Sequence, residues 1–283
     1  MALLTIEMKS TKLGCPETVK VLLPEFLEAE KRGAGEKMKV LWLLHGATAG
    51  PNDWLLETNL ARYVKDRNLM VVLPSALNSD YSNYNVFANG FNFRDFFLEE
   101  LMPMMYSWFP ASRKREDNYI AGYSMGGTGA MQFGFLNPEL FGGIGIFSSA
   151  PRDVDALRPV RNMKSEVWRI EGRDGNRFPG VYPPGYNNKE INMIGKYPTV
   201  GDFLDSPENT WDRFLDAVKG GNLPPILVSV GSEDRCLRRV ERFKTLAGEV
   251  GAENITFDVI DGYAHEIAVW DIAIQRFLDF FQL

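Results

Sequence analysis

Short, continuously apolar runs recur along the chain, and segments with a different hydrophobic spacing separate them. A run of this kind, bounded by turn-forming residues, is typical of a strand that is buried on both faces of a sheet. The predicted strands lie at 40–44, 70–73, 118–122, 142–150, 226–230 and 255–260. No internal repeat accompanies them. The pattern therefore predicts buried strands spread along most of the chain.

Helical spacing fills most of the intervals between these strands. In 53–68, for example, Leu56, Leu60 and Val64 recur on one face of a predicted helix. Further helices are predicted at 94–108, 125–136, 210–221, 237–250 and over the last residues up to Leu283. Pro103 should kink the first of these, because proline has no backbone N–H to donate. Strands that alternate with helices predict right-handed crossovers and a mostly parallel sheet with helices on both faces, an α/β fold.

The alternation stops between Pro151 and about Leu223, where Arg, Asn, Pro and Gly dominate. This stretch contains too few core-forming residues to fold by itself. We therefore predict a single domain, 1–283, that carries a cap-like insertion at 152–223. The aromatic residues of the insertion, expected to form walls over a pocket mouth, are Trp168, Phe178, Tyr182, Tyr186, Tyr197, Phe203 and Trp211.

Composition narrows the class of protein. The 283 residues are 45% apolar and 24% charged, which is an ordinary globular balance. The formal net charge of −6 disfavours nucleic acid and anionic membranes as partners. The N-terminal stretch lacks the pattern of a signal peptide, no window is long and apolar enough to span a membrane, and the two cysteines lack metal-ligand spacing. We expect a cytoplasmic protein without metal or cofactor, and its assembly into a homo-oligomer is left open.

The predicted strand at 118–122 leads into a Gly-x-Ser-x-Gly pattern centred on Ser124. Ser124 lies between a strand and a helix, which is the context of a nucleophile elbow. Gly122 and Gly126 leave room for a sharp turn whose backbone would clash with side chains. The pattern favours Ser124 as a nucleophile over a turn that binds phosphate or nothing.

A serine nucleophile needs a base, and the chain has two histidines, of which only His265 follows Ser124. His265 comes after the last predicted strand, as the chain order Ser, acid, His of this architecture requires. Asp234, just past the strand at 226–230, is the predicted acid that orients the imidazole. Glu233 is the near alternative, and Asp261 is a weaker one.

The tetrahedral intermediate of acyl transfer needs two hydrogen-bond donors. The backbone N–H of Met125, directly after the nucleophile, is the first expected donor. The second should come from the loop after the strand at 40–44, and Ala47 is the predicted residue, with Gly46 as the alternative. His45 is expected to hold this loop rather than to act as a second base.

Four segments together carry a family resemblance. They are "LLHGATAG" at 43–50, "AGYSMGG" at 121–127, "GSED" at 231–234 and "AHEIAVW" at 264–270. In this order they resemble the esterase D branch of the α/β-hydrolases, and the chain is most similar to its tributyrin-type carboxylesterases. The resemblance covers roughly 19–150 and 225–281, and it implies an α/β-hydrolase fold with Ser124, Asp234 and His265 as the catalytic triad.

The resemblance also implies an activity. It favours a serine carboxylesterase that hydrolyses short-chain or moderately sized carboxylic esters, with a small-molecule ester as substrate. Feruloyl, carbohydrate acetyl and S-formylglutathione esters are alternative substrates within the same branch. The loop at 43–50 lacks the cysteine usual in formylglutathione hydrolases, which disfavours the last of these. A hydrolase-fold protein that binds ligands without catalysis is the alternative from a different class.

Overall fold

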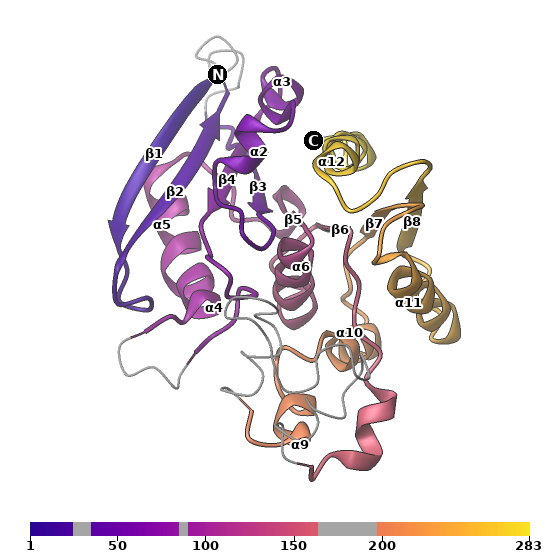
Figure 1. Cartoon of the computed structure of the whole chain (residues 1–283). Helices are drawn as coiled ribbons and strands as arrows, with labels where there is room; N and C mark the ends of the chain where they lie inside the picture. Colours follow the sequence, from indigo (N-terminus) through magenta and orange to yellow (C-terminus); the bar gives the residue numbers. More distant parts are fainter. Residues whose placement is uncertain (25–34, 85–89, 164–196) are drawn as a thin grey trace.

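The computed structural model of the chain describes residues 1–24, 35–84, 90–163 and 197–283. Eight strands of the described part form one sheet, in the order β1-β2-β4-β3-β5-β6-β7-β8 (Figure 1). The strands are β1 (Ala2–Lys9), β2 (Pro16–Leu23), β3 (Lys39–Leu44), β4 (Leu69–Pro74), β5 (Asn118–Tyr123), β6 (Gly143–Phe147), β7 (Ile226–Gly231) and β8 (Ile255–Ile260). β1 and β2 pair antiparallel, as do β2 and β4, and every pair from β4 to β8 is parallel.

The central strands are continuously apolar because each face of the sheet packs on its own core. In β3, Trp42 and Leu44 belong to one buried cluster, whereas Leu41 and Leu43 belong to the other. Side chains alternate between the faces of a strand, so a strand that is covered on both faces needs apolar residues at every position.

Helices cover both faces, as the alternation of elements predicts. The face of Trp42 is covered by α4 (Phe93–Asp95), η1 (Phe96–Leu101), α5 (Met102–Trp108), α6 (Met125–Leu136), η3 (Asp155–Val160), α9 (Val200–Leu204), α10 (Thr210–Lys219) and α11 (Leu237–Glu249). The face of Leu41 is covered by α2 (Asp53–Leu56), α3 (Leu60–Val64) and α12 (Ile267–Phe280). A short helix, η2 (Arg115–Asp117), leads into β5.

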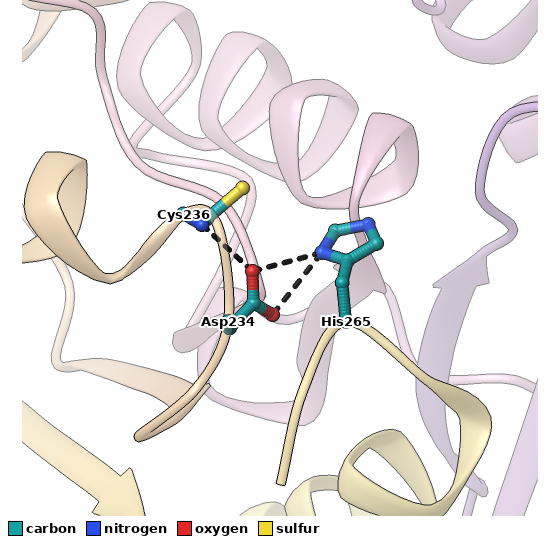
Figure 2. Close-up of side chains that lie close together, drawn as sticks. All are labelled: Asp234, Cys236 and His265. Atoms are coloured by element: carbon teal, nitrogen blue, oxygen red, sulfur yellow. Dashed lines mark hydrogen bonds and ion pairs between the residues drawn. The ribbon is translucent and has the colours of Figure 1, made fainter.

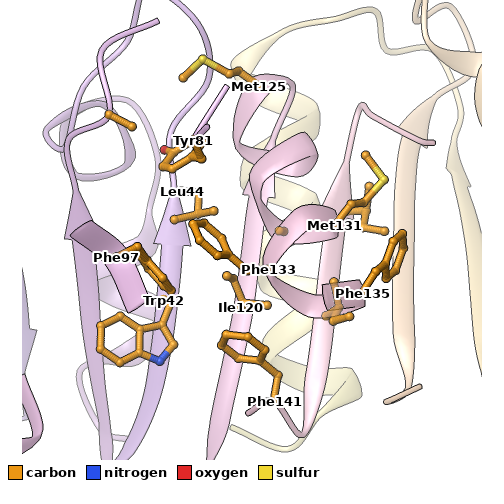
Figure 3. Packing of buried hydrophobic residues seen from close by; sticks show 14 of the residues in the cluster. Trp42, Leu44, Tyr81, Phe97, Ile120, Met125, Met131, Phe133, Phe135 and Phe141 are labelled. Carbon is orange, nitrogen blue, oxygen red and sulfur yellow. The ribbon is translucent and has the colours of Figure 1, made fainter. Parts of the chain in front are cut away.

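Helix α6 lies at the centre of the larger cluster (Figure 3). The Phe133 ring stacks on Phe97 with ring centroids 4.2 Å apart, and Phe97 also meets the edge of Trp42 at 5.3 Å. This packing fixes the helix that begins directly after Ser124.

The predicted helix at 53–68 is interrupted. The chain forms α2 and α3 instead, and the break at 57–59 lies between them. Thr58 Oγ1 donates to the Trp54 carbonyl and accepts from the N–H of Leu60 at 3.2 Å, while Asp271 accepts from the N–H of Asn59 at 2.7 Å. These side chains take over backbone hydrogen bonds that a continuous helix would have made, so the helix ends there.

A π-helical segment precedes the predicted proline kink. The helix over 93–108 consists of α4, the π-helical turns of η1 and then α5, where Pro103 is in the first turn. Since Pro103 has no N–H to donate, the local hydrogen-bond pattern changes at this point.

The described ends of the predicted insertion, 152–163 and 197–223, pack on the domain. Leu157, Phe203 and Trp211 belong to the same buried cluster as α6, and the ring centroids of Phe135 and Phe214 are 5.6 Å apart. Trp168, Phe178, Tyr182 and Tyr186, which we expected to form walls over a pocket mouth, lie outside the described residues.

No helix in the described part of the chain is both long enough and apolar enough to cross a membrane.

Helix α6 passes so close to the end of β3 that Gly126 has no room for a side chain. A Cβ atom on Gly126 would lie 2.4 Å from the Leu44 carbonyl oxygen, which is a backbone atom that cannot move aside. Gly126→Ala should therefore lower the free energy of unfolding by about 1–3 kcal/mol or more, measured by urea denaturation. The matched control is Gly248→Ala in α11, where a Cβ meets nothing within 4 Å. The control should stabilise the protein by about 0.5–1 kcal/mol, and equal effects of the two changes would contradict this account.

Candidate active site

Ser124 lies on a sharp turn between β5 and α6. Its backbone adopts φ 52° and ψ −113°, and its N–H donates to the Phe147 carbonyl at 2.8 Å. A Cβ on Gly122 would lie 2.5 Å from the carbonyl carbon of Gly126, so the turn tolerates no side chain there. A positive φ is unfavourable for a residue with a side chain, and strain of this kind is common at functional sites. The glycines around Ser124 therefore permit a conformation that the turn requires.

His265 and Asp234 extend a line of hydrogen bonds from Ser124. Nε2 of His265 lies 3.0 Å from Ser124 Oγ. On the other side of the ring, Nδ1 lies 3.0 and 3.1 Å from the two carboxylate oxygens of Asp234 (Figure 2). The three residues follow the carboxyl ends of β5, β7 and β8, which lie at one edge of the parallel sheet. The sheet therefore gathers residues that are far apart in the sequence.

Asp234 is ionised and buried. Burial alone would raise the pKa of Asp234, but hydrogen bonds from His265, Ser148 and the Cys236 backbone outweigh it and lower this pKa to about 2. An ionised carboxylate can only accept, so Nδ1 of His265 carries the proton that it donates to Asp234. Nε2 is then the acceptor for the Ser124 hydroxyl.

The pKa of His265 is raised above its ordinary value. Burial alone would lower it, but the hydrogen bond with Asp234 and the nearby Cys236 raise it by more. Asp234 thus favours the charged form of His265, the form that the imidazole takes after it has accepted a proton.

The two alternative acids, Glu233 and Asp261, are exposed, whereas Asp234 is buried against His265. The Glu233 side chain is exposed, and its backbone N–H donates to the Tyr263 carbonyl at 2.9 Å. Asp261 is also exposed and accepts from the Ser232 hydroxyl at 3.2 Å. Asp234 is the carboxylate that the structure brings against His265.

Sequence reasoning missed two residues, Ser148 and Trp270, that hold Asp234 in place through hydrogen bonds. The indole N–H of Trp270 donates to Ser148 Oγ at 2.8 Å, so the Ser148 hydroxyl is free to donate its own proton to Asp234. Trp270 also stacks on Tyr123 at 3.9 Å and meets the His265 ring edge-on at 5.2 Å. Ser148 directly follows β6, and this position at a strand end is a signal that could have identified it, whereas the sequence around Trp270 offers no such signal.

His45 fixes the loop that follows β3. Its Nε2 accepts from the Ala76 N–H at 2.9 Å, so Nδ1 carries the proton and donates it to the Gly46 carbonyl at 2.7 Å. Burial lowers the pKa of His45, so it stays neutral. With both ring nitrogens engaged, His45 is a structural residue of the loop that contains Ala47.

The two expected oxyanion donors lie on elements that flank Ser124. Met125 is the first residue of α6, where backbone N–H groups have no partner within the helix. Ala47 lies exposed on the loop after β3. The Gly46 backbone is hydrogen-bonded to the His45 ring and to the Tyr123 phenol.

A cavity of about 90 Å³ lies beside α6. Thr128, one helical turn from Ser124, contributes to its wall, and the Thr128 N–H donates to the Ser124 carbonyl at 3.2 Å. The described residues that line it are Asp80, Ser82, Tyr84, Thr128, Met131, Gln132, Ala150, Arg152, Tyr197, Phe203, Glu208, Thr210 and Arg239. Tyr197 and Phe203 belong to the predicted insertion, so its described part reaches the neighbourhood of Ser124.

One group of side chains in the described part of the chain has the composition and spacing to ligate a metal. It consists of Asp234, Cys236 and His265. The sequence did not suggest Cys236 as a ligand, because Cys236 is distant from His265 along the chain.

The fold and the position of the site define an α/β-hydrolase. Three solved structures are similar to the chain over 99% of its length and over 97–98% of their own chains. They are the serine hydrolase FphF of Staphylococcus aureus (TM-score 0.76, 23% identity) and the S-formylglutathione hydrolase FrmB of the same organism (TM-score 0.73, 22% identity). The third is a ferulic acid esterase (TM-score 0.70, 19% identity). The model of the Esterase family, described as "Putative esterase", matches residues 10–280. The chain belongs to this family.

A curated relative gives a more limited match. The acetyl esterase of Caldicellulosiruptor saccharolyticus is 33% identical over 153 residues, which are 53% of this chain and 57% of that protein. The chain therefore matches this relative over little more than half of its length.

The position of Ser148 generates a prediction about acid stability. Ser148→Ala removes a hydrogen bond to an ionised, buried carboxylate and should lower the free energy of unfolding by about 1.5–3 kcal/mol at pH 7. The folded pKa of Asp234, about 2, is below its ordinary value near 3.9, so its ionised form stabilises the fold above about pH 4. The difference between wild type and variant should therefore shrink as the pH falls from about 4 towards 2.

Urea denaturation at several pH values measures this difference. Trp270→Phe is the comparison variant, because it keeps an aromatic ring beside Tyr123 and removes the indole N–H that donates to Ser148. Trp270→Phe should leave the pH dependence of the free energy of unfolding closer to that of wild type than Ser148→Ala does. A Ser148→Ala difference that stays constant down to pH 2 would contradict the assigned hydrogen bond.

Proposed function

We propose that the chain is a serine carboxylesterase that hydrolyses short-chain or moderately sized carboxylic esters through an acyl-enzyme. Ser124 is the nucleophile, His265 is the general base and acid, and Asp234 orients the imidazole. The observation that carries this proposal is the unbroken line of hydrogen bonds from Asp234 through His265 to Ser124 Oγ. Membership of the Esterase family supports it.

Each proton of the reaction then has a place. Ser124 Oγ attacks the ester carbonyl as its proton passes to Nε2 of His265. The imidazolium, whose Nδ1–H is held by Asp234, gives this proton to the departing alcohol. A water molecule then repeats the attack on the acyl-enzyme, with His265 again accepting and returning the proton, and the carboxylic acid leaves.

The negative oxygen of the intermediate is stabilised by the backbone N–H groups of Met125 and Ala47. Met125 has the aligned donor of a helix N-terminus. Ala47 is the better second donor than Gly46, because the Gly46 N–H already donates to the Tyr123 phenol oxygen.

The cavity beside α6 is the proposed site of the acyl or alcohol group. Its wall includes Tyr197 and Phe203, so we assign the insertion at 152–223 of the single 1–283 domain a role in substrate selection. An acetyl ester, named for the curated relative, and a butyryl ester of the tributyrin type are the first substrates to test.

The two cysteines support a reducing compartment such as the cytoplasm. Cys15 and Cys236 are both free thiols in the folded chain. Proteins of oxidising compartments more often pair their cysteines.

Removal of the nucleophile tests the proposal. Ser124→Ala should fold normally and lose esterase activity by a factor on the order of 10⁵–10⁶ in kcat, because the triad acts as a unit. His265→Ala should cost about as much, and the double variant little more. Hydrolysis of 4-nitrophenyl acetate measures the effect, and activity of Ser124→Ala within tenfold of wild type would refute the assignment.

The pH profile tests the role of Asp234. His265 must be neutral to accept a proton, so kcat/KM should fall as the pH drops through its pKa, which is raised above 6.5. Asp234→Asn removes the carboxylate that raises this pKa, so the acid limb of the residual activity should move to lower pH. Its kcat should fall by about 10⁴.

Glu233→Gln is the matched control for this profile. The exposed Glu233 lies next to Asp234 in the sequence, and its change should affect neither kcat nor the acid limb strongly. If Glu233→Gln had the larger effect, the orienting role would pass to Glu233.

The cavity wall yields a prediction about substrate choice. Phe203→Leu enlarges the cavity while it keeps an apolar residue in the core, so butyrate and hexanoate esters should gain relative to acetate by about tenfold in kcat/KM. Trp211→Phe is the control, because Trp211 is buried in the insertion and stacks under Arg242 without lining the cavity. An unchanged ranking in Phe203→Leu would show that the cavity does not hold the acyl group.

A further inference from the structure

Cys236 lies beside the Asp234–His265 pair, and esterase chemistry does not require its thiol. One ligand atom each from Asp234, Cys236 and His265 lies within 4.8 Å of the other two (Figure 2). Nδ1 of His265 points toward the Asp234 carboxylate, and Figure 2 shows Cys236 Sγ on this side of the imidazole. The thiol is therefore placed on the side of the imidazole that faces away from Ser124.

The thiol of Cys236 has no capping role in the helix that begins after it. Cys236 is the N-cap residue of α11, where a Ser, Thr, Asp or Asn side chain would accept a hydrogen bond from the first turn. Its side chain makes no such bond, whereas its backbone N–H donates to Asp234 Oδ1 at 2.7 Å and its carbonyl accepts from the N–H groups of Arg239 and Val240.

These three side chains are a suitable donor set for zinc. Thiolate, imidazole and carboxylate are the ligands that Zn²⁺ takes, at about 2.0–2.3 Å in a tetrahedron, and three of them can leave a fourth position for water. The charges of Asp234 and a Cys236 thiolate would together cancel those of the cation. Such neutrality matters because Asp234 and Cys236 are 4% and 9% exposed. The ligand atoms would close by about 1 Å around the ion.

We propose that Asp234, Cys236 and His265 form a binding site for a thiophilic divalent cation such as Zn²⁺, and that its occupancy switches the esterase off. The inhibitory part of this inference rests on the proposed function of His265, whereas binding of the cation does not.

The mechanism of inhibition follows from the two nitrogens of the imidazole. A cation on Nδ1 occupies the lone pair that becomes available when the Nδ1 proton moves to Nε2. Nε2–H can then only donate to Ser124, so the base can no longer accept the Ser124 proton. The tautomer change conserves the imidazole proton, and the Cys236 thiol releases one proton to solvent as it becomes the thiolate ligand.

Inhibition is the first test. The chelator-treated protein is titrated with buffered Zn²⁺, and hydrolysis of 4-nitrophenyl acetate is expressed relative to the metal-free rate of each variant. Zn²⁺ should inhibit wild type, EDTA should restore the rate, and Mg²⁺ should have no effect because it prefers oxygen ligands. Cys236→Ser should raise the half-inhibiting Zn²⁺ concentration by at least about tenfold.

Cys15→Ser is the matched control, because Cys15 is the other free thiol and lies outside the cluster. Its half-inhibiting concentration should equal that of wild type. No inhibition of wild type would overturn the inhibitory part of the proposal, and equal inhibition of wild type and Cys236→Ser would overturn the role of Cys236 as a ligand.

Binding is tested without activity. Co²⁺ is added to the Ser124→Ala protein, which keeps all three ligands, and a thiolate-to-cobalt charge-transfer band is sought in the near ultraviolet. The band should appear in Ser124→Ala and disappear in Ser124→Ala/Cys236→Ser. A band without inhibition of wild type would refute the role of His265 as a base and leave the cation site standing, whereas absence of the band would overturn the site itself.

Discussion

Ser124 holds a backbone conformation, φ 52° and ψ −113°, that is costly for a residue with a side chain, and the rest of the site is arranged around it. Strain of this kind costs on the order of 1–3 kcal/mol and persists only where the surroundings enforce it. Here β5 is buried on both faces, and α6 is held against β3 so closely that Gly122 and Gly126 admit no Cβ. The same turn exposes Ser124 Oγ and begins α6 at Met125. Packing in the core therefore determines the positions of both the proposed nucleophile and the first expected oxyanion donor.

Burial of Asp234 makes the rest of the polar network necessary. An isolated carboxylate at this depth would take up a proton, and an uncharged Asp234 could no longer stabilise a charged His265. Hydrogen bonds from Ser148, His265 and the Cys236 backbone keep it ionised, and Trp270 holds Ser148 in place. The residues behind the triad therefore matter for the protonation states in it, although they lie away from Ser124.

Much of the fold could be predicted from the sequence, because buried strands and helices have clear hydrophobic periods. β1 and β2 were missed because they form an antiparallel pair at the sheet edge, where exposed positions dilute the apolar signal. The break between α2 and α3 depends on Asp271, which is distant in sequence, and no local pattern shows it. The site was predictable in outline because functional residues collect at strand ends. Trp270 was not, since it reaches Ser148, the partner of Asp234, only through the folded chain.

Covalent labelling with a fluorophosphonate probe, followed by mass spectrometry of the peptides, tests most directly whether Ser124 is an activated nucleophile. The serine alkoxide attacks phosphorus, so labelling requires the strained turn and the base His265, and it does not depend on knowing the natural ester. The account predicts one adduct, on Ser124, that forms rapidly in wild type and at least about a thousandfold more slowly in His265→Ala. A folded protein that remains unlabelled, or an adduct on a different residue, would contradict it.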